Sequence, residues 1–196
     1  SSGGAIYAAI HPQQRITRVI NSTFIANAAV PVANGTAGSG AISSNGDNVM
    51  LNCVFVRNTG GIGAITNGYG GTQINCSFYG NKANANADPT ANKGGAIYNI
   101  SGGKQINCII YGNTSTGPVS GNEIYNYGTG SVQNSCIIGG LPATRDVNGN
   151  FGSNPQFYNP AADDLHIGPS SPAVNSGANY TSPDIATDIE GFPRIT

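Results

Sequence analysis

The chain has 196 residues, of which only 9% are charged, and its formal net charge is −1. This length favours one domain, or two at most, and the low charge argues against binding nucleic acid by phosphate neutralisation. Hydrophobic residues still reach 38%, which is too many for a disordered chain. Glycine and asparagine supply 29 and 25 residues. Both are poor helix formers, so the composition favours an all-β fold.

Two short blocks alternate along the first 140 residues. The first block reads Gly-Ala-Ile or a degenerate variant, and its isoleucines are Ile6, Ile42, Ile65, Ile97 and Ile124. The second block reads Ile-Asn-Cys-x-Phe or a variant, and its asparagines are Asn21, Asn52, Asn75, Asn107 and Asn134. Apolar and polar residues alternate within the second block, as is typical of a half-buried strand.

Blocks of constant length separated by variable segments indicate a solenoid, in which equal strands stack and one corner carries the insertions. The insertions are predicted at residues 31–39, 82–93 and 114–121. We expect residues 1–140 to form a right-handed parallel β-helix of about five rungs, because parallel crossovers are almost always right-handed. The inward isoleucines and phenylalanines, at about 2 kcal/mol each, should supply most of the stability.

The alternation also predicts which side chains are buried. Ile74, Cys76 and Phe78 should point inward, and the residues between them outward. A further asparagine follows the phenylalanine or isoleucine of the second block after three residues, as Asn27, Asn58, Asn81 and Asn113. We expect these asparagines at turns, because asparagine tolerates left-handed backbone and its amide can bond to the next asparagine in the stack. We favour this structural role for them over a binding role.

Gly-Gly-Ala-Ile stands at residues 3–6 and 94–97, and Phe-x-x-Asn at 24–27, 55–58 and 78–81. This pairing resembles the repeats of polymorphic outer-membrane proteins, which are surface-exposed right-handed β-helices of bacteria that act in adhesion. The fourth copy departs from the second motif, with isoleucine at position 110, and the fifth copy lacks it. The resemblance implies an adhesive role at a bacterial cell surface.

The C-terminal region carries Asn-Pro-Gln-Phe at 154–157, Asp-Leu-His-Ile at 164–167, Ser-Pro-Ala-Val-Asn-Ser-Gly at 171–177 and Asp-Ile-Glu-Gly-Phe-Pro-Arg at 188–194. It resembles the end of large secreted "choice-of-anchor" β-helix proteins of Bacteroidetes type. That resemblance implies an extracellular or cell-surface location, bacterial export machinery as a partner, and an anchoring or sorting segment beyond this one. We expect residues 141–196 to form an irregular cap that hides the open strand edge of the last rung.

The acidic residues of the repeats do not form a catalytic pattern. Lyases of this shape need a carboxylate cluster for Ca²⁺, and hydrolases need paired carboxylates. The repeats contain only Asp47, Asp88 and Glu123, at positions that are not equivalent, and Asp163-Asp164 is expected to cap a turn. We therefore predict no catalytic residue, no cofactor and no enzymatic activity. The alternative is a polysaccharide lyase or hydrolase with its catalytic rungs outside this segment.

The cysteines and histidines give no metal site by their spacing. Cys53, Cys76 and Cys108 share one inward position, while Cys136 is one place out of line. Buried free thiols are favoured, although neighbouring rungs are close enough for a Cys53–Cys76 disulfide, which stays open. His11 and His166 are isolated in the sequence.

Amides and aromatic rings recur on the side of the strands that is expected to face outward. Together they suit glycan recognition, because sugars present hydroxyls and apolar faces. The glycan-facing residues predicted on this ground are Asn52, Asn75, Asn107, Tyr79 and Tyr111. The alternative is that these rows only stabilise the stack.

These observations predict a non-enzymatic, extracellular adhesin or structural stalk. Its expected partners are a polysaccharide, or the surface of a host or neighbouring cell, and not nucleic acid. No run of apolar residues approaches the length of a transmembrane segment.

Overall fold

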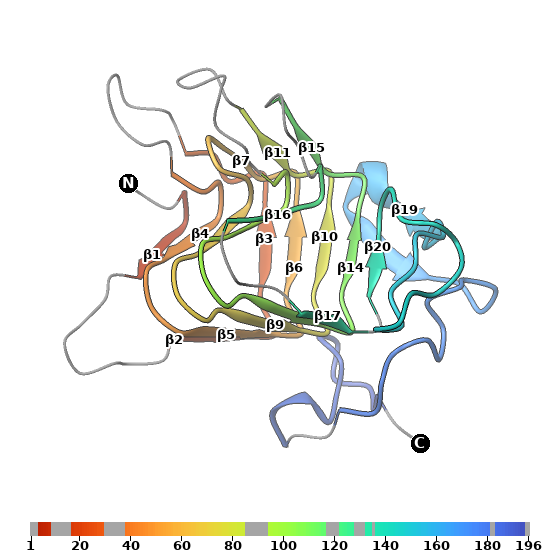
Figure 1. Ribbon diagram of the computed structural model, residues 1–196. Coiled ribbons are helices and arrows are strands. Elements are labelled where there is room, and N and C mark those ends of the chain that lie inside the picture. Colours follow the sequence, from red (N-terminus) through yellow and green to blue (C-terminus); the bar gives the residue numbers. More distant parts are fainter. Residues whose placement is uncertain are drawn as a thin grey trace.

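The computed structural model describes residues 4–8, 17–29, 38–84, 94–116, 122–127, 132–134, 136–180 and 183–194. Over these residues the chain is all-β, with two 3₁₀ turns and no α-helix. Most strands lie in parallel sheets, in which each strand pairs with the equivalent strand of the neighbouring repeat (Figure 1). The predicted insertions at 31–39, 82–93 and 114–121 fall largely outside the described residues.

Four parallel sheets carry the repeats. The first sheet consists of β1 (Ile6–Ala8), β4 (Ile42–Ser44), β8 (Ile65–Asn67), β12 (Ile97–Asn99) and β16 (Ile124–Asn126). The second consists of β2 (Thr17–Ile20), β5 (Asn48–Leu51), β9 (Thr72–Ile74), β13 (Lys104–Ile106) and β17 (Val132–Asn134). The third consists of β3 (Thr23–Ile25), β6 (Val54–Val56), β10 (Ser77–Tyr79), β14 (Ile109–Tyr111) and β18 (Ile137–Ile138). The fourth has three short strands, β7 (Thr59–Gly60), β11 (Lys82–Ala83) and β15 (Thr114–Ser115).

Equivalent residues of the repeats lie over one another, as predicted. In the first sheet the paired positions are Ile6, Ile42, Ile65, Ile97 and Ile124. In the third sheet Phe24 pairs with Phe55, and Phe55 with Phe78. Each repeat therefore adds one strand to each of the first three sheets, and like side chains meet along the stack.

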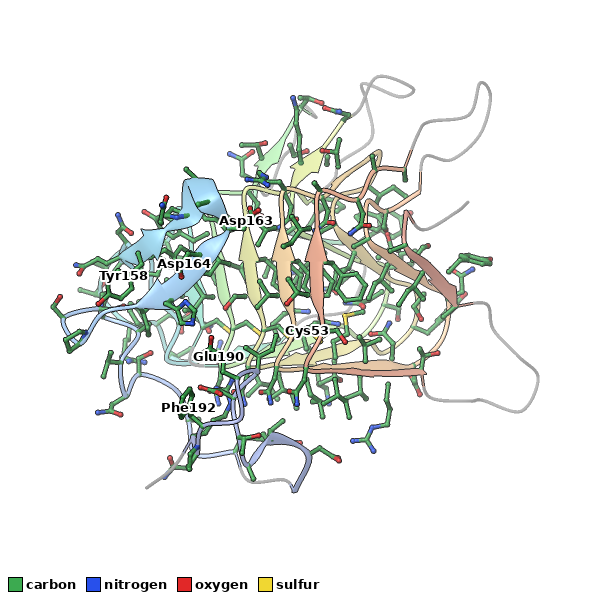
Figure 2. All side chains as sticks on the ribbon, turned by 180° about the vertical axis from the view of Figure 1, so that it is seen from behind. Cys53, Tyr158, Asp163, Asp164, Glu190 and Phe192 are labelled. Atoms are coloured by element: carbon green, nitrogen blue, oxygen red, sulfur yellow. The ribbon has the colours of Figure 1, made fainter. Side chains whose placement is uncertain are left out.

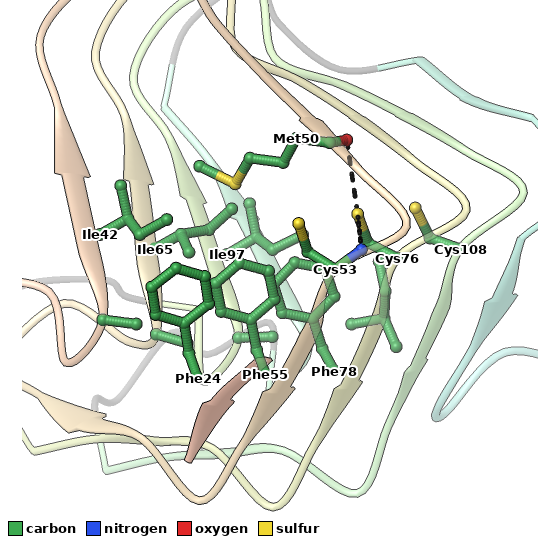
Figure 3. Packing of buried hydrophobic residues seen from close by; sticks show 14 of the residues in the cluster. Phe24, Ile42, Met50, Cys53, Phe55, Ile65, Cys76, Phe78, Ile97 and Cys108 are labelled. Carbon is green, nitrogen blue, oxygen red and sulfur yellow. Dashed lines mark hydrogen bonds between the residues drawn. The ribbon is translucent and has the colours of Figure 1, made fainter. Parts of the chain in front are cut away.

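The core lies between these sheets and consists of stacked identical side chains (Figure 3). The ring centroids of Phe24 and Phe55 are 4.9 Å apart, and those of Phe55 and Phe78 are 4.6 Å apart. The rings are parallel to within 5°. Ile42, Ile65 and Ile97 form a second buried row beside them. One repeat could not bury these faces alone, so the neighbouring repeats complete its core.

Close backbone contacts between repeats explain the glycines that precede Ala-Ile. A Cβ on Gly63 would lie 2.2 Å from the carbonyl oxygen of Gly94, and Gly63 has a φ of +106°. A Cβ on Gly95 would lie 2.3 Å from the carbonyl oxygen of Asn122. Only glycine fits where backbones approach so closely.

The expectation that Ile74 points inward was wrong. Ile74 packs in a second cluster with Leu51 and Ile185, on the outer side of the second sheet. The residue after it, Asn75, has a φ of +54°, so a left-handed corner separates Ile74 from Cys76. The period-two alternation applies only within a straight strand, and it ends at this corner.

The predicted alignment of the fifth repeat was also wrong by one residue. Asn134 pairs with Ile106, and Ile137 pairs with Ile109. Cys136 is therefore in line with Cys108, whose backbone N–H lies 3.4 Å from the Cys136 Sγ. Between its first block and its second block, the fifth repeat therefore has one more residue than the sequence alignment allowed.

The described C-terminal segment, residues 139–180 and 183–194, begins over the last repeat. There Phe151 extends the third sheet by a parallel bridge to Ile137, and Asn150 Oδ1 accepts from the Cys136 N–H. The segment then forms an antiparallel pair, with β19 (Phe157–Asn159), a 3₁₀ turn η1 (Pro160–Ala162), β20 (Asp164–Ile167) and a later 3₁₀ turn η2 (Pro183–Ile185). Past that pair it lies along the outside of the stack (Figure 1). Burial of Ile185 against Leu51 and Ile74 accounts for this placement.

Candidate ligand-binding site

Two rows of asparagine run along the stack, and the first is structural. The inner row consists of Asn27, Asn58, Asn81 and Asn113. In the last three, Oδ1 accepts hydrogen bonds from the backbone N–H and the Nδ2 of the preceding asparagine, at 2.8–3.0 Å. The Nδ2 groups of the last three also donate to the backbone carbonyls of Phe24, Phe55 and Phe78. The predicted bonding from one asparagine to the next is confirmed for this row.

The inner row ends on a carboxyl group. Glu123 accepts hydrogen bonds from Asn113 Nδ2 at 2.6 Å and from the backbone N–H groups of Gly112 and Asn113. Its carboxyl thus takes the place that the next asparagine amide would occupy. Burial raises the pKa of Glu123 to about 7, and the residue faces the interior rather than a ligand.

A further polar row inside the stack was missed by the sequence reasoning. Asn67 Nδ2 donates to Asn99 Oδ1 at 2.7 Å, and Gln105 Nε2 donates to Gln73 Oε1 at 2.8 Å. All four side chains are buried. The sequence does contain a signal for this row. Asn67 lies two residues after the inward Ile65, so both side chains are on the same face of the strand.

The outer row occupies the corner between the second and third sheets. It consists of Asn21, Asn52, Asn75 and Asn107, which all have left-handed backbone with φ of 49–54°. The left-handed conformation had been expected at the inner row instead. Asparagine adopts it at lower cost than other non-glycine residues, which explains why this residue type recurs here.

The C-terminal segment bonds directly to the outer row. Asn52 Nδ2 donates to the carbonyl oxygen of Thr187 at 2.8 Å. Asn107 uses both ends of its amide, since Oδ1 accepts from the Ala178 N–H and Nδ2 donates to the Ala178 carbonyl, each at 2.8 Å. Asn52 is only 2% exposed. Two of the three predicted glycan-facing asparagines are therefore bonded to the protein itself.

Two adjacent cavities remain between the outer row and the C-terminal segment. The smaller has a volume of about 310 Å³ and the larger about 530 Å³. Asn75, Ser77 and Arg194 line both. The side chains of Asn75 and Ser77 form no hydrogen bond within the described part of the chain. Asn75, which was predicted from the sequence, thus presents a free amide where the two cavities meet.

The larger cavity is lined by acidic residues of the C-terminal segment. Figure 2 shows Asp163, Asp164 and Glu190 there. The His166 ring bonds to Asp164 through Nδ1 and to Glu190 Oε1 through Nε2, the latter at 3.0 Å. Hydrogen bonds to both carboxylates raise the pKa of His166, and the bonds from His166 lower the pKa of Asp164.

Among the described residues, two that line the larger cavity have a buried acceptor atom without a hydrogen-bond donor. One is Oδ1 of Asn52, and the other is Oδ1 of Asp163. The second carboxylate oxygen of Asp163 accepts from Arg57 Nη2 at 2.7 Å. A buried acceptor without a donor is uncommon in native proteins, but both atoms have almost no exposed surface and are therefore not open to the cavity that their residues line.

The smaller cavity contains the aromatic side chain of the site. Tyr180 lines it and is 43% exposed, and Asn175 and Asn179 lie beside it. An exposed ring next to amide groups provides an apolar face and hydrogen bonds together.

The predicted tyrosines lie elsewhere. Tyr79 packs edge-on against Phe157, with centroids 5.6 Å apart, and Tyr111 is half-buried beside it in the third sheet. Neither lines the cavities. The structure therefore does not bring Tyr79 and Tyr111 together with Asn75.

The remaining candidates give no second site. All four cysteines are buried free thiols, so the Cys53–Cys76 bridge is absent. In the described ranges no group of three or more His, Cys, Asp or Glu is arranged to hold a metal ion, and no helix has the length and apolar character to cross a membrane. Asp47 is exposed in a turn. His11 and Asp88 lie outside the described residues.

The sequence reasoning missed the residues that the C-terminal segment contributes. Asp163 does end the turn η1, with a φ of +66°, as expected, but it also lines the larger cavity. His166, Tyr180, Glu190 and Arg194 meet Asn75 only because the segment folds back along the stack. No spacing in the sequence indicates this contact.

Comparisons with protein-family models, with curated proteins and with solved structures gave no match to this chain. The resemblance to bacterial surface repeats therefore rests on the motifs alone.

Proposed function

We propose that the chain is a right-handed parallel β-helix that works outside a bacterial cell as an adhesin or stalk module and binds glycans. The observation that carries the glycan proposal is the free amide of Asn75, which lines both cavities and shares the smaller one with the exposed ring of Tyr180. Amides and a flat aromatic face are the groups that sugars need.

Strand pairing supports the β-helix. The chain returns to the first, second and third sheets once per repeat and always pairs in parallel. A parallel return of this kind is right-handed in about 98% of known cases. Stacked in-register repeats form a rod-like element, which suits a stalk that holds a binding site away from a cell surface.

The composition supports a location outside the cell and a non-enzymatic role. The Gly-Gly-Ala-Ile and Phe-x-x-Asn motifs resemble those of exported surface repeats, which implies bacterial export or anchoring machinery as a partner. An acid catalyst in the cavities would need a carboxyl group with a raised pKa. Glu123 has one, but it is sequestered in the inner row.

The test is binding of the whole chain to an array of bacterial, plant and animal glycans, followed by attachment of cells that display it. Asn75→Asp should reduce both signals. The matched control is Asn21→Asp in the same row, because Asn21 has the same left-handed backbone and lines neither cavity, and an aspartate there still presents an oxygen to accept from Asn52 Nδ2.

Two results would reject the proposal. If no glycan binds and attachment is unchanged when the module is deleted, only a spacer role remains. If the chain itself cleaves a polysaccharide, and Asn75→Asp or a carboxylate variant of the cavities abolishes cleavage, the module is a lyase or hydrolase.

A further inference from the structure

We infer that the two cavities form one groove along the axis of the stack, and that this groove binds an extended run of about four sugar units rather than a single sugar. The inference rests on the proposed glycan binding and specifies the ligand class as a linear oligosaccharide or polysaccharide. Three features carry it: the residues that line each cavity, the polar groups where the cavities meet, and the paired backbone of the floor.

The floor of each cavity consists of equivalent residues from successive repeats. In the third sheet the larger cavity is lined by Thr23, Val54 and Ser77, and the smaller one by Ser77, Ile109 and Ile137. Because Ser77 belongs to both sets, the two floors join into one column through all five repeats. Five strands spaced by about 4.8 Å make this column roughly 19 Å long. A sugar unit of an extended chain is close in length to one strand spacing, so the column accommodates about four units.

The outer row of asparagine runs beside this column. Asn52 and Asn75 line the larger cavity, and Asn75 and Asn107 line the smaller one. Apart from Cys108, the remaining lining residues come from the C-terminal segment, which therefore forms the other wall. The groove is thus elongated across the strands, in the direction in which the repeats stack. A ligand that fills it has to be long and narrow.

Polar groups without a protein partner meet halfway along the groove. Asn75, Ser77 and Arg194 line both cavities. Among the described residues, the side chains of Asn75 and Ser77 form no hydrogen bond, and Arg194 donates only through Nε, to the Thr187 carbonyl at 3.2 Å. An amide, a hydroxyl and a guanidinium can bond the hydroxyl, ether or carboxylate oxygens of a sugar. These three groups therefore anchor the middle of the chain, whether the sugar is neutral or acidic.

The two ends of the groove add contacts that only a longer chain can reach together. Thr23 is exposed at the first repeat, in the edge strand β3, and lines only the larger cavity. Tyr180 is 43% exposed and lines only the smaller cavity, where its ring can cover the apolar face of a sugar. A single sugar held at Asn75 cannot contact both ends. Affinity should therefore grow with chain length until the column is filled.

A sugar chain fits this groove better than an extended peptide does. Extended peptides bind best at a sheet edge with free backbone groups. Here the backbone N–H groups of the floor already bond between repeats, as from Asn75 to the Ile106 carbonyl at 3.0 Å and from Ser77 to the Cys53 carbonyl at 2.9 Å. The third sheet therefore offers side chains only to a ligand that lies across its strands.

Calorimetric titration of the whole chain with sugars of increasing length tests the inference. The probes are cello-, manno- and galacturono-oligosaccharides of two to six units, and the same length series of the tightest linear glycan found on the array. In the series that binds, we expect Kd to fall at least tenfold between two units and four. Between five and six units it should change less than twofold, because the column is then filled.

Substitutions at the ends of the groove locate the chain. Thr23→Lys, which fills the end at the first repeat, should weaken the five- and six-unit sugars at least fivefold and leave the two-unit sugar unchanged. Ile25→Lys is its matched control, since Ile25 is exposed on the same strand and lines neither cavity. Tyr180→Ala should weaken the long sugars, whereas Tyr158→Ala, at an exposed tyrosine outside both cavities, should not. Asn75→Asp should weaken every length.

The outcomes separate this inference from the proposed function. Equal Kd values for two and six units, or an effect of Thr23→Lys no larger than that of Ile25→Lys, would overturn the groove but leave glycan binding intact. A Kd that still falls tenfold between five and six units would place the ligand outside the two cavities and also overturn it. Failure of every sugar, both here and on the array, rejects glycan binding itself.

A hexaserine peptide tests the other occupant of such a groove. If it binds in an Asn75-dependent manner while the sugars do not, the groove takes peptides and the inference is wrong. Circular dichroism of each variant verifies that the fold is retained.

Discussion

The inner and outer rows of asparagine run along the same stack, but their side chains differ in what they bond to. In the inner row Asn58 and Asn81 are fully buried, and their amide groups bond to the neighbouring asparagine and to backbone carbonyls. In the outer row the backbone is left-handed; Asn52 Nδ2 bonds both to Asn21 Oδ1 and to the C-terminal segment, Asn107 bonds to that segment, and Asn75 faces the cavities. An amide that is enclosed by the stack stabilises it, whereas one at an outer corner keeps donors and acceptors for another partner.

The largest expected difference between the rows is in stability. Asn81→Ala should lower the free energy of unfolding by about 4 kcal/mol, because it removes the acceptor of the Asn58 N–H and Nδ2 and the side-chain donor to the Phe55 carbonyl and to Asn113 Oδ1. Urea unfolding followed by circular dichroism measures this change. A loss below about 1 kcal/mol would show that the inner row is not structural.

The carboxyl end of the inner row predicts a pH dependence. The ordinary pKa of the Glu123 carboxyl is 4.5, and in the folded chain burial raises it to about 7. The folded state therefore binds the proton more tightly, and the free energy of unfolding should fall by about 3 kcal/mol as the pH rises from about 4.5 to about 7. Urea unfolding at several pH values between 4.5 and 8 would reveal this slope.

Glu123→Gln is the control for this slope. The pKa of His166 is also raised on folding, so His166 contributes a loss of the same sign as the pH rises. The glutamine variant keeps that contribution and removes the one from Glu123. Identical slopes for the wild type and the variant would contradict the assignment.

The packing of the C-terminal segment against the outer side of the second sheet should depend on Ile185. This side chain is 3% exposed and packs on Leu51 and Ile74, so Ile185→Ala should weaken docking by about 2 kcal/mol. Hydrogen exchange of the Ala178 N–H, which bonds to Asn107 Oδ1, should accelerate, while exchange in the third sheet stays unchanged. Ile189→Ala, at a residue that is 36% exposed, should have little effect. Equal acceleration throughout the stack would show that the segment and the stack unfold together.

The smallest stability effect is expected at Asn75. Asn75→Ala loses no hydrogen bond to the described residues and should cost only about 1 kcal/mol, from the left-handed backbone. Asn75→Gly should remove most of that cost. Urea unfolding of both variants beside Asn81→Ala compares the two rows directly. A loss at Asn75 as large as that at Asn81 would mean that the outer row too is a structural ladder.

Much of the stack could be predicted, because each repeat carries the same sequence pattern. Gly-Ala-Ile and Ile-Asn-Cys-x-Phe mark strands whose copies can bury their apolar faces only against one another. The prediction of side-chain direction and register failed at two places where the chain departs from this pattern. At Asn75 a corner reverses the side on which Ile74 lies, and in the fifth copy one extra residue shifts Asn134 and Cys136.

The candidate site was predicted only in part. Asn52, Asn75 and Asn107 were identified as one outward row, since a periodic position in a stack defines a line along its surface. Which of them is free depends on where Ala178 and Thr187 bond. Tyr79 and Tyr111 were chosen by the same periodicity, but the C-terminal segment packs Phe157 against Tyr79 and contributes Tyr180 to the cavity instead.

The sequence by itself determined the parallel stack, its register through the first four repeats and the isoleucine, phenylalanine and cysteine rows of its core. These follow from local alternation and from repetition, which act between neighbouring copies. Only the tertiary structure decided the path of residues 139–194, and with it the two cavities, the unpaired Oδ1 atoms and the acidic lining. That path depends on contacts between residues far apart in the chain, such as Ile185 with Leu51, and such contacts leave no period in the sequence.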